Sequence, residues 1–168
     1  EILCDGGNMA TDGENFSECT DLSLLTTYAK PTMHLFTTTW GTSSATAQAS
    51  NLAARLISEY PNAWPETIRA LLIHSARWTD AMKAQFCIPD TKTKGRRDLL
   101  RTCGYGIPNL DTAIQCMNNN VNLVIEAELQ PFTKDGMNEM HTHKIPWPRE
   151  VLENLGSTPA TMRVTLSY

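Results

Sequence analysis

The 168-residue sequence has no long uninterrupted apolar run, because Arg55 and Arg69 break its most hydrophobic stretches. A membrane-spanning helix needs about 20 consecutive, predominantly apolar residues, so the sequence favours no membrane partner. The first residues, Glu1-Ile2-Leu3, also lack the basic segment followed by an apolar run that marks a secretory signal peptide.

An excess of positive charge is absent as well, since 14 Lys and Arg are outnumbered by 18 Asp and Glu, for a net charge of −4. Nucleic-acid binding draws mainly on lysine and arginine contacts with phosphates, so nucleic acid is disfavoured as a partner. Hydrophobic residues make up 41% and charged residues 19% of the chain, which is typical of a folded domain. The length suits one domain, or one domain with part of a second.

Cysteine pairs of the C-x-x-C type are missing, and the five cysteines are irregularly spaced: Cys4, Cys19, Cys87, Cys103 and Cys116. A zinc cluster needs closely paired ligands, so the cysteines predict no zinc site. The sequence indicates no other metal site and no cofactor. We interpret the cysteines as mostly buried, reduced thiols of a cytoplasmic protein, with a disulfide as the alternative.

The first 120 residues are expected to mix helices with strands. Residues 5–30 are polar and rich in turn residues, which predicts a long surface loop. Residues 33–40 predict a short strand, and the alanine-rich spacing from residue 43 to 60 predicts a helix buried on most sides. Further helices are predicted from Pro65 and over residues 110–117.

Residues 90–101 carry five basic side chains interleaved with Asp90 and Asp98. This pattern favours a solvated loop over a basic binding patch.

The composition changes near residue 120, where alternating apolar residues begin. Strands are predicted over residues 121–127, near Lys144 and over residues 162–168. In the last of these, Met162, Val164, Leu166 and Tyr168 share one face, which predicts a half-buried strand. We therefore expect one domain over residues 1–120 and the start of a mainly β domain over residues 121–168.

Ser43 lies where a glycine turn meets the long alanine-rich helix, within Gly41-Thr42-Ser43-Ser44-Ala45-Thr46. Free N–H groups at a helix N-terminus favour negative charge, which suits a nucleophilic serine and the oxyanion formed on its acyl group. The alternative is that Ser43 or Thr42 simply caps the helix.

Four segments in the same order resemble the subtilases, the subtilisin-like serine peptidases. They are the serine motif at 41–46, the strand and glycine turn of residues 1–8, the helix from Pro65, and the loop over residues 104–109. The resemblance covers about residues 1–117, and is strongest to bacterial members in which a β-sandwich-like region follows the peptidase domain. One departure is Ala47, where subtilases usually have proline.

The resemblance implies an α/β fold: the C-terminal portion of a subtilisin-like parallel-sheet domain, followed by a partial β-sandwich-like region. It implies that Ser43 is the catalytic nucleophile of a serine endopeptidase, that its own backbone N–H is an oxyanion donor, and that Gly41 and Thr42 support the motif. The family's Asp, His and oxyanion Asn precede the serine, and no Asp or His motif of that kind occurs in the residues before Ser43. We therefore expect the 168-residue piece to be inactive alone, with a peptide or protein as substrate and the upstream part of the same protein, or a second copy, as partner.

Two alternatives concern histidines. His74 follows Ser43 in the serine-first order of α/β-hydrolases, but the G-x-S-x-G turn of that fold is absent. His141 and His143 share a strand face, but no third metal ligand accompanies them, which favours a plain surface strand.

The alternative function is a non-catalytic binding or scaffold module that keeps the subtilase fold. The presence or absence of the upstream Asp and His distinguishes the two.

Overall fold

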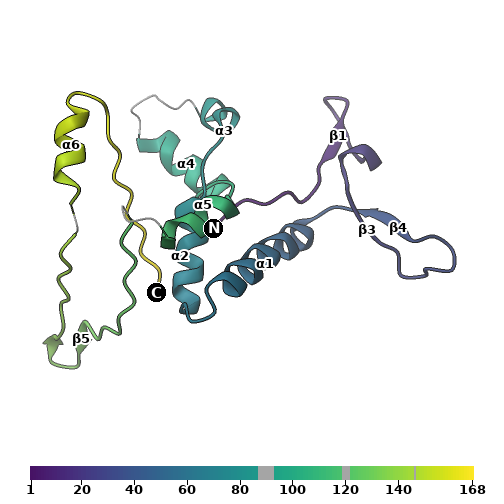
Figure 1. Ribbon diagram of the computed structural model, residues 1–168. Helices are drawn as coiled ribbons and strands as arrows, with labels where there is room; N and C mark the ends of the chain where they lie inside the picture. The colour runs from purple at the N-terminus through teal and green to yellow at the C-terminus, as the bar shows by residue number, and fades with distance from the viewer. Residues whose placement is uncertain (87–92, 119–121, 146) are drawn as a thin grey trace.

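The computed structural model describes residues 1–86, 93–118, 122–145 and 147–168. Helices gather in the middle of the molecule, the N-terminal hairpins extend to one side, and the C-terminal segment extends on the other (Figure 1). The helices are α1 Thr42–Glu59, α2 Pro65–Ser75, α3 Asp80–Gln85, α4 Thr93–Cys103, α5 Leu110–Asn118 and α6 Arg149–Leu155.

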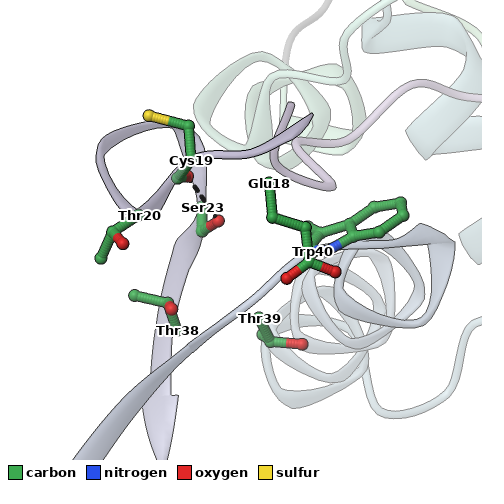
Figure 2. A pocket seen from close by; sticks show the side chains of 7 residues that line it. All are labelled: Glu18, Cys19, Thr20, Ser23, Thr38, Thr39 and Trp40. Carbon is green, nitrogen blue, oxygen red and sulfur yellow. Dashed lines mark hydrogen bonds between the residues drawn. The ribbon is translucent and has the colours of Figure 1, made fainter. Parts of the chain in front are cut away.

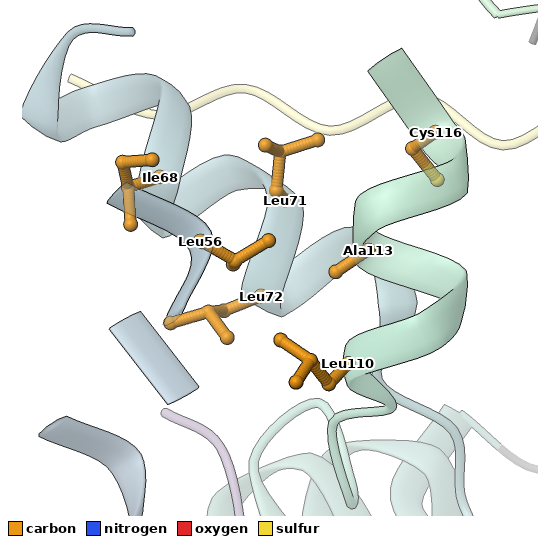
Figure 3. Close-up of a cluster of buried hydrophobic side chains, with 7 residues drawn as sticks. All are labelled: Leu56, Ile68, Leu71, Leu72, Leu110, Ala113 and Cys116. Atoms are coloured by element: carbon orange, nitrogen blue, oxygen red, sulfur yellow. The ribbon is translucent and has the colours of Figure 1, made fainter. Parts of the chain in front are cut away.

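The core is a contact between α1, α2 and α5 (Figure 3). Its buried side chains are Leu56 from α1, Ile68, Leu71 and Leu72 from α2, and Leu110, Ala113 and Cys116 from α5. Helix α2 follows its predicted start, since Pro65 occupies the first turn, where its fixed φ and missing N–H are tolerated. The predicted helix over residues 110–117 is confirmed as α5.

The predicted helix over residues 43–60 is confirmed as α1. Its alanine-rich sequence predicted burial on most sides, and that prediction is wrong. Leu56 is its one buried residue, and Ala47 and Ala54 are exposed. The small residues therefore leave a long exposed face along α1.

The polar stretch before Lys30 is not a loop. It forms the antiparallel pair β1 Met9–Thr11 and β2 Phe16–Glu18, then the 3₁₀ turn η1 Thr20–Leu22, and then β3 Leu24–Thr27 paired with β4 Phe36–Thr39. The turn signal Asp12-Gly13 connects two strands too short to show in an apolar pattern, with Asp12 Oδ1 accepting the N–H of Asn15 at 2.8 Å. The strand expected over residues 33–40 is confirmed as β4.

Strand pairing in the described ranges is antiparallel throughout, in three two-stranded sheets. The chain is thus a mixed α/β structure, and the parallel sheet that the resemblance implies does not appear among its described residues. Residues 1–3 lie along residues 104–106 instead, where Leu3 N–H donates to Gly106 at 2.8 Å and Tyr105 N–H to Glu1 at 2.8 Å.

The charged stretch before Arg101 was expected to be a loop, but from residue 93 onward it is helix α4. Its Lys and Arg residues are good helix formers, and Leu99 and Cys103, four residues apart, are buried on one face. Residues 90–92 of the predicted loop lie outside the described residues.

After residue 121, regular strands are rarer than the sequence indicated. Residues 122–130, the described residues around Lys144 and residues 162–168 form no strand, and residue 121 lies outside the described residues. A hairpin of β5 Phe132–Thr133 with β6 Gly136–Met137 forms in this region instead.

Residues 162–168 alternate between two faces as predicted, but the polar side chains face inward and the apolar ones outward. Arg163, Thr165 and Ser167 face inward, whereas Val164 and Tyr168 are 77% and 92% exposed. Arg163 and Thr165 face inward because they meet polar groups at the C-terminal end of α2, as described next.

Helix α2 is capped at both ends by residues from this later region. At its N-terminus, Glu126 Oε1 accepts the Trp64 N–H at 2.8 Å and the Thr67 hydroxyl at 2.5 Å. At its C-terminus, Arg163 donates to the carbonyls of Ala76 at 2.9 Å and Ile73 at 3.2 Å. A carboxylate at the N-terminus and a guanidinium at the C-terminus both complement the helix dipole.

Among the described residues, no helix has the length and apolar character needed to span a membrane.

Candidate active site

Ser43 lies in the first turn of α1, two residues after a glycine with a positive φ. Gly41 precedes the helix with φ at 132°, a conformation open to glycine, and its carbonyl accepts the Ser44 N–H at 3.1 Å. Ser43 is exposed, and its own N–H has no acceptor in the described part of the chain. A free N–H group and an exposed hydroxyl at a helix N-terminus are the features expected of an oxyanion-binding nucleophile.

The turn Asp5-Gly6-Gly7-Asn8 packs directly against this helix start. The Gly41 N–H donates to the Gly6 carbonyl at 2.6 Å, and Gln48 Nε2 of α1 donates to the Asp5 carbonyl at 2.6 Å. A Cβ atom on Gly6 would lie 3.0 Å from the Gly41 carbonyl oxygen. Glycine at this position therefore allows the two backbones to approach and fixes the turn before Ser43.

Asn8 is a candidate that the sequence reasoning missed. Its N–H donates to the Leu22 carbonyl at 2.7 Å, and its Oδ1 accepts the Met9 N–H at 2.9 Å. With the side-chain oxygen engaged, the amide nitrogen is the end left to donate. The signal was present in the glycine turn itself, because an asparagine directly follows the two glycines that pack on the helix start.

No hydrogen bond joins the Ser43 hydroxyl to a basic side chain anywhere in the described ranges. The histidines are engaged elsewhere. His34 stacks on Tyr28 with 3.9 Å between ring centroids, and His141 and His143 meet edge to face at 6.1 Å.

His74 is bound to the C-terminal segment. Its Nδ1 lies 2.9 Å from the Thr165 hydroxyl, and burial, reinforced by the nearby Arg77, lowers the pKa of His74 below its ordinary value of 6.5. A hydrogen bond to Thr165 gives His74 a structural role in α2, in line with the expectation that it is not the base.

No cluster of metal-ligating side chains occurs among the residues described. The four cysteines within those ranges, Cys4, Cys19, Cys103 and Cys116, are free thiols, and Cys87 lies outside them.

A pocket of about 470 Å³ opens beside the serine turn (Figure 2). It is lined by Glu18, Cys19, Thr20, Ser23, Thr38, Thr39 and Trp40. The last of these directly precedes Gly41, and the remainder come from β2, η1, β4 and their connections. Residues from the stretch before Lys30, the end of β4 at Thr39 and the following Trp40 thus line one pocket.

Comparison with known families identifies a relationship for most of the chain. Residues 1–106 match the profile described as the Subtilase family. The chain belongs to the subtilase family. The match contains the Asp5–Asn8 turn, Ser43 and all of α1 and α2. Three of the four segments that carried the resemblance therefore lie within it, and the match ends inside the fourth, at residue 106 of the loop 104–109.

A relative is the uncharacterized protein y4bN of Sinorhizobium fredii (strain NBRC 101917 / NGR234), which is 31% identical over 134 residues. The aligned part is 80% of this chain and 28% of the relative, so the subtilase chain spans a little over a quarter of that protein. No solved structure matches the chain.

Proposed function

We propose that Ser43 is the nucleophile of a subtilisin-like serine endopeptidase, acting in a longer protein of which this chain forms a part. The observation that carries the proposal is the geometry of the α1 N-terminus in a chain of the subtilase family. Ser43 is exposed there, its N–H lacks an acceptor within the described ranges, and the turn before it is fixed by the bond between Gly41 and Gly6.

The chemistry follows from that arrangement. The Ser43 oxygen attacks the carbonyl carbon of a peptide, and the negative charge that develops on the carbonyl oxygen is stabilised by the Ser43 N–H. The Asn8 amide nitrogen is the second donor, because its turn packs on the same helix start and its oxygen is already engaged by Met9. Two fixed donors stabilise the transition state without reorganisation of solvent.

A serine hydroxyl is a weak nucleophile until a base removes its proton. Since no imidazole of the described residues is bonded to Ser43, the base and its orienting carboxylate are proposed to come from an upstream part of the same protein. The relative's greater length supports this reading. The 168 residues alone are then inactive, and the parallel sheet and the two-domain division at residue 120 are proposed for the complete protein.

The free thiols within the described ranges support the proposed cytoplasmic location. A peptide or protein is the proposed substrate, and no nucleic acid, membrane, metal or cofactor enters the mechanism.

The test is hydrolysis of a casein substrate by the intact parent protein and by three variants. Ser43→Ala is expected to abolish activity, whereas Ser44→Ala, a matched loss of the next hydroxyl, is expected to keep it. Asn8→Ala is expected to lower kcat about 10²- to 10³-fold, a range already measured for loss of one oxyanion donor within the subtilase family. Full activity of Ser43→Ala contradicts the assignment of Ser43 as the nucleophile. A folded wild-type parent that does not hydrolyse casein favours the non-catalytic binding module.

A further inference from the structure

The pocket beside Ser43 combines features that select one class of side chain. Its lining is mostly polar and consists of three threonines, a serine, a cysteine, Glu18 and Trp40. Figure 2 draws the Glu18 side chain reaching from the end of β2 toward Trp40 and Thr39. An apolar side chain gains little in such a pocket, because it leaves these polar groups without partners.

The position of the pocket relative to the serine is fixed by backbone contacts. Trp40 is followed by Gly41, whose N–H is bonded to Gly6, and a Cβ atom on Gly7 would lie 3.0 Å from the Trp40 Cβ. Glu18 is held opposite Met9 in the β1–β2 pair, and Met9 directly follows Asn8. Two pocket residues are thus connected to the proposed catalytic centre. Trp40 directly precedes Gly41, and Glu18 pairs with Met9, the neighbour of Asn8.

The carboxylate of Glu18 is exposed and has no ion pair with a cation of the described residues. The surrounding sequence is also strongly acidic, since residues 1–41 contain six Asp and Glu and one Lys. A field of this sign attracts cations to the pocket before they bind.

The aromatic ring adds a second attraction for the same class of group. A Lys or Arg side chain binds favourably over the face of a tryptophan and forms strong hydrogen bonds with a carboxylate. Trp40 is 45% exposed, so part of its ring is open to a ligand. A volume of about 470 Å³ accommodates one long side chain.

We propose that this pocket is a substrate subsite for a cationic side chain, lysine or arginine, of a peptide bound at Ser43. The inference rests on the proposed peptidase function and names its substrate class. Glu18 supplies the charge, Trp40 the aromatic face, and the hydroxyls of Thr38, Thr39 and Thr20 accept the remaining N–H groups of the substrate.

The experiment measures kcat/KM of the intact parent protein on a neutral peptide into which one lysine, or one methionine of similar length, is placed at each position in turn. The wild type is expected to prefer lysine at one position. Glu18→Gln is expected to lower that lysine-to-methionine ratio about 10- to 100-fold, the usual effect of a hydrogen bond to a charged group. Trp40→Leu is expected to lower the ratio about 2- to 5-fold.

The matched control is Glu14→Gln, which removes the same charge from the turn between β1 and β2 and does not line the pocket. It is expected to keep the ratio, apart from a small effect that high salt removes. Glu18→Lys should reverse the preference toward a glutamate at the same position, which supplies a gain of function independent of folding losses.

Failure of the subsite proposal can be distinguished from failure of the peptidase proposal, because the wild type and each variant are also treated with a fluorophosphonate that labels an active serine. A labelled Ser43 with no lysine preference, or a preference that survives Glu18→Gln, overturns the subsite and keeps the peptidase. An unlabelled Ser43 in the folded wild type overturns both.

Discussion

At the scale of single residues, the two glycines before Asn8 show how the backbone positions the candidate site. Gly7 has φ at 77°, and a Cβ atom there would lie 3.0 Å from the Trp40 Cβ and 3.3 Å from the Leu22 carbonyl oxygen. Gly13 also has a positive φ, of 101°, but nothing lies within 4 Å of its Cβ position. A substitution at Gly13 therefore tests the cost of the positive φ alone, whereas one at Gly7 also tests the cost of steric crowding.

We expect Gly7→Ala to reduce the free energy of unfolding by about 1–2 kcal/mol for its backbone conformation and by about 1–3 kcal/mol more for the crowding against Trp40. Gly13→Ala should show the first cost alone. Urea unfolding of both variants measures the difference. Equal losses contradict the close packing of the Asp5–Asn8 turn on the serine turn.

His74 makes stability depend on pH. Its pKa is lowered in the folded state, so the unfolded state binds the proton more readily, and its contribution is full above pH 6.5. That contribution is lost as the pH falls below 6.5 and through the lowered pKa. The midpoint of thermal unfolding should therefore fall between pH 7 and pH 5.

The variant His74→Asn, which keeps a donor or acceptor for Thr165, should show a smaller fall over the same interval. Removal of the exposed His143 by His143→Asn serves as the control. An unchanged pH dependence in His74→Asn contradicts the role of burial at this imidazole.

Sequence reasoning at this scale located Ser43 at the start of a helix, because a glycine, hydroxyl residues and an alanine-rich run give a local signal. It missed Asn8, since the contact between Gly6 and Gly41 joins residues 35 positions apart. A local pattern does not contain such a contact.

At the scale of elements, α2 is the helix most firmly fixed, with its apolar face in the core and both ends capped by later residues. Its start and its buried face were predictable from Pro65 and the spacing of Ile68, Leu71 and Leu72. The reversed face of residues 162–168 was not, because alternation identifies two faces without saying which one meets a neighbour. The carbonyls at the end of α2 favour Arg163 there over an apolar side chain.

The cap at the start of α2 gives a prediction. Glu126→Ala removes the acceptor of the Trp64 N–H and should lower the free energy of unfolding by about 0.5–2 kcal/mol. Glu128→Ala removes an exposed carboxylate from the same segment and should change it by less than about 0.5 kcal/mol. Hydrogen exchange in the first turn of α2 checks the location, and an equal effect of both variants contradicts a specific cap.

At the scale of the whole molecule, the surface area is large for the mass. The accessible surface is 13,351 Å², whereas a compact monomer of 18.7 kDa exposes about 8,300 Å². The excess is comparable to a large, permanent protein interface. It supports the proposal that further parts of the same protein, or a second copy, cover the outward face of Val164, Leu166 and Tyr168.

The parts of the fold that were predictable from the sequence are those whose packing partners lie within the chain. Helices α1, α2 and α5 have periodic apolar faces that meet one another within the chain, and the sequence indicated all three. The expected parallel sheet and β-sandwich depend on pairing between distant segments, which a periodic pattern within one segment does not specify. The short strands β1 and β2 were hidden because three residues are too few to show a period.

Ser43 is proposed to be a nucleophile whose activation depends on residues outside these 168. The most direct measurement treats the intact parent protein, its Ser43→Ala variant and the 168-residue chain with a fluorophosphonate probe, and maps the labelled residue by mass spectrometry. We predict a label on Ser43 of the parent, none on the Ser43→Ala variant, and none on the 168-residue chain. A folded parent that takes no label, or one labelled equally after Ser43→Ala, contradicts the account.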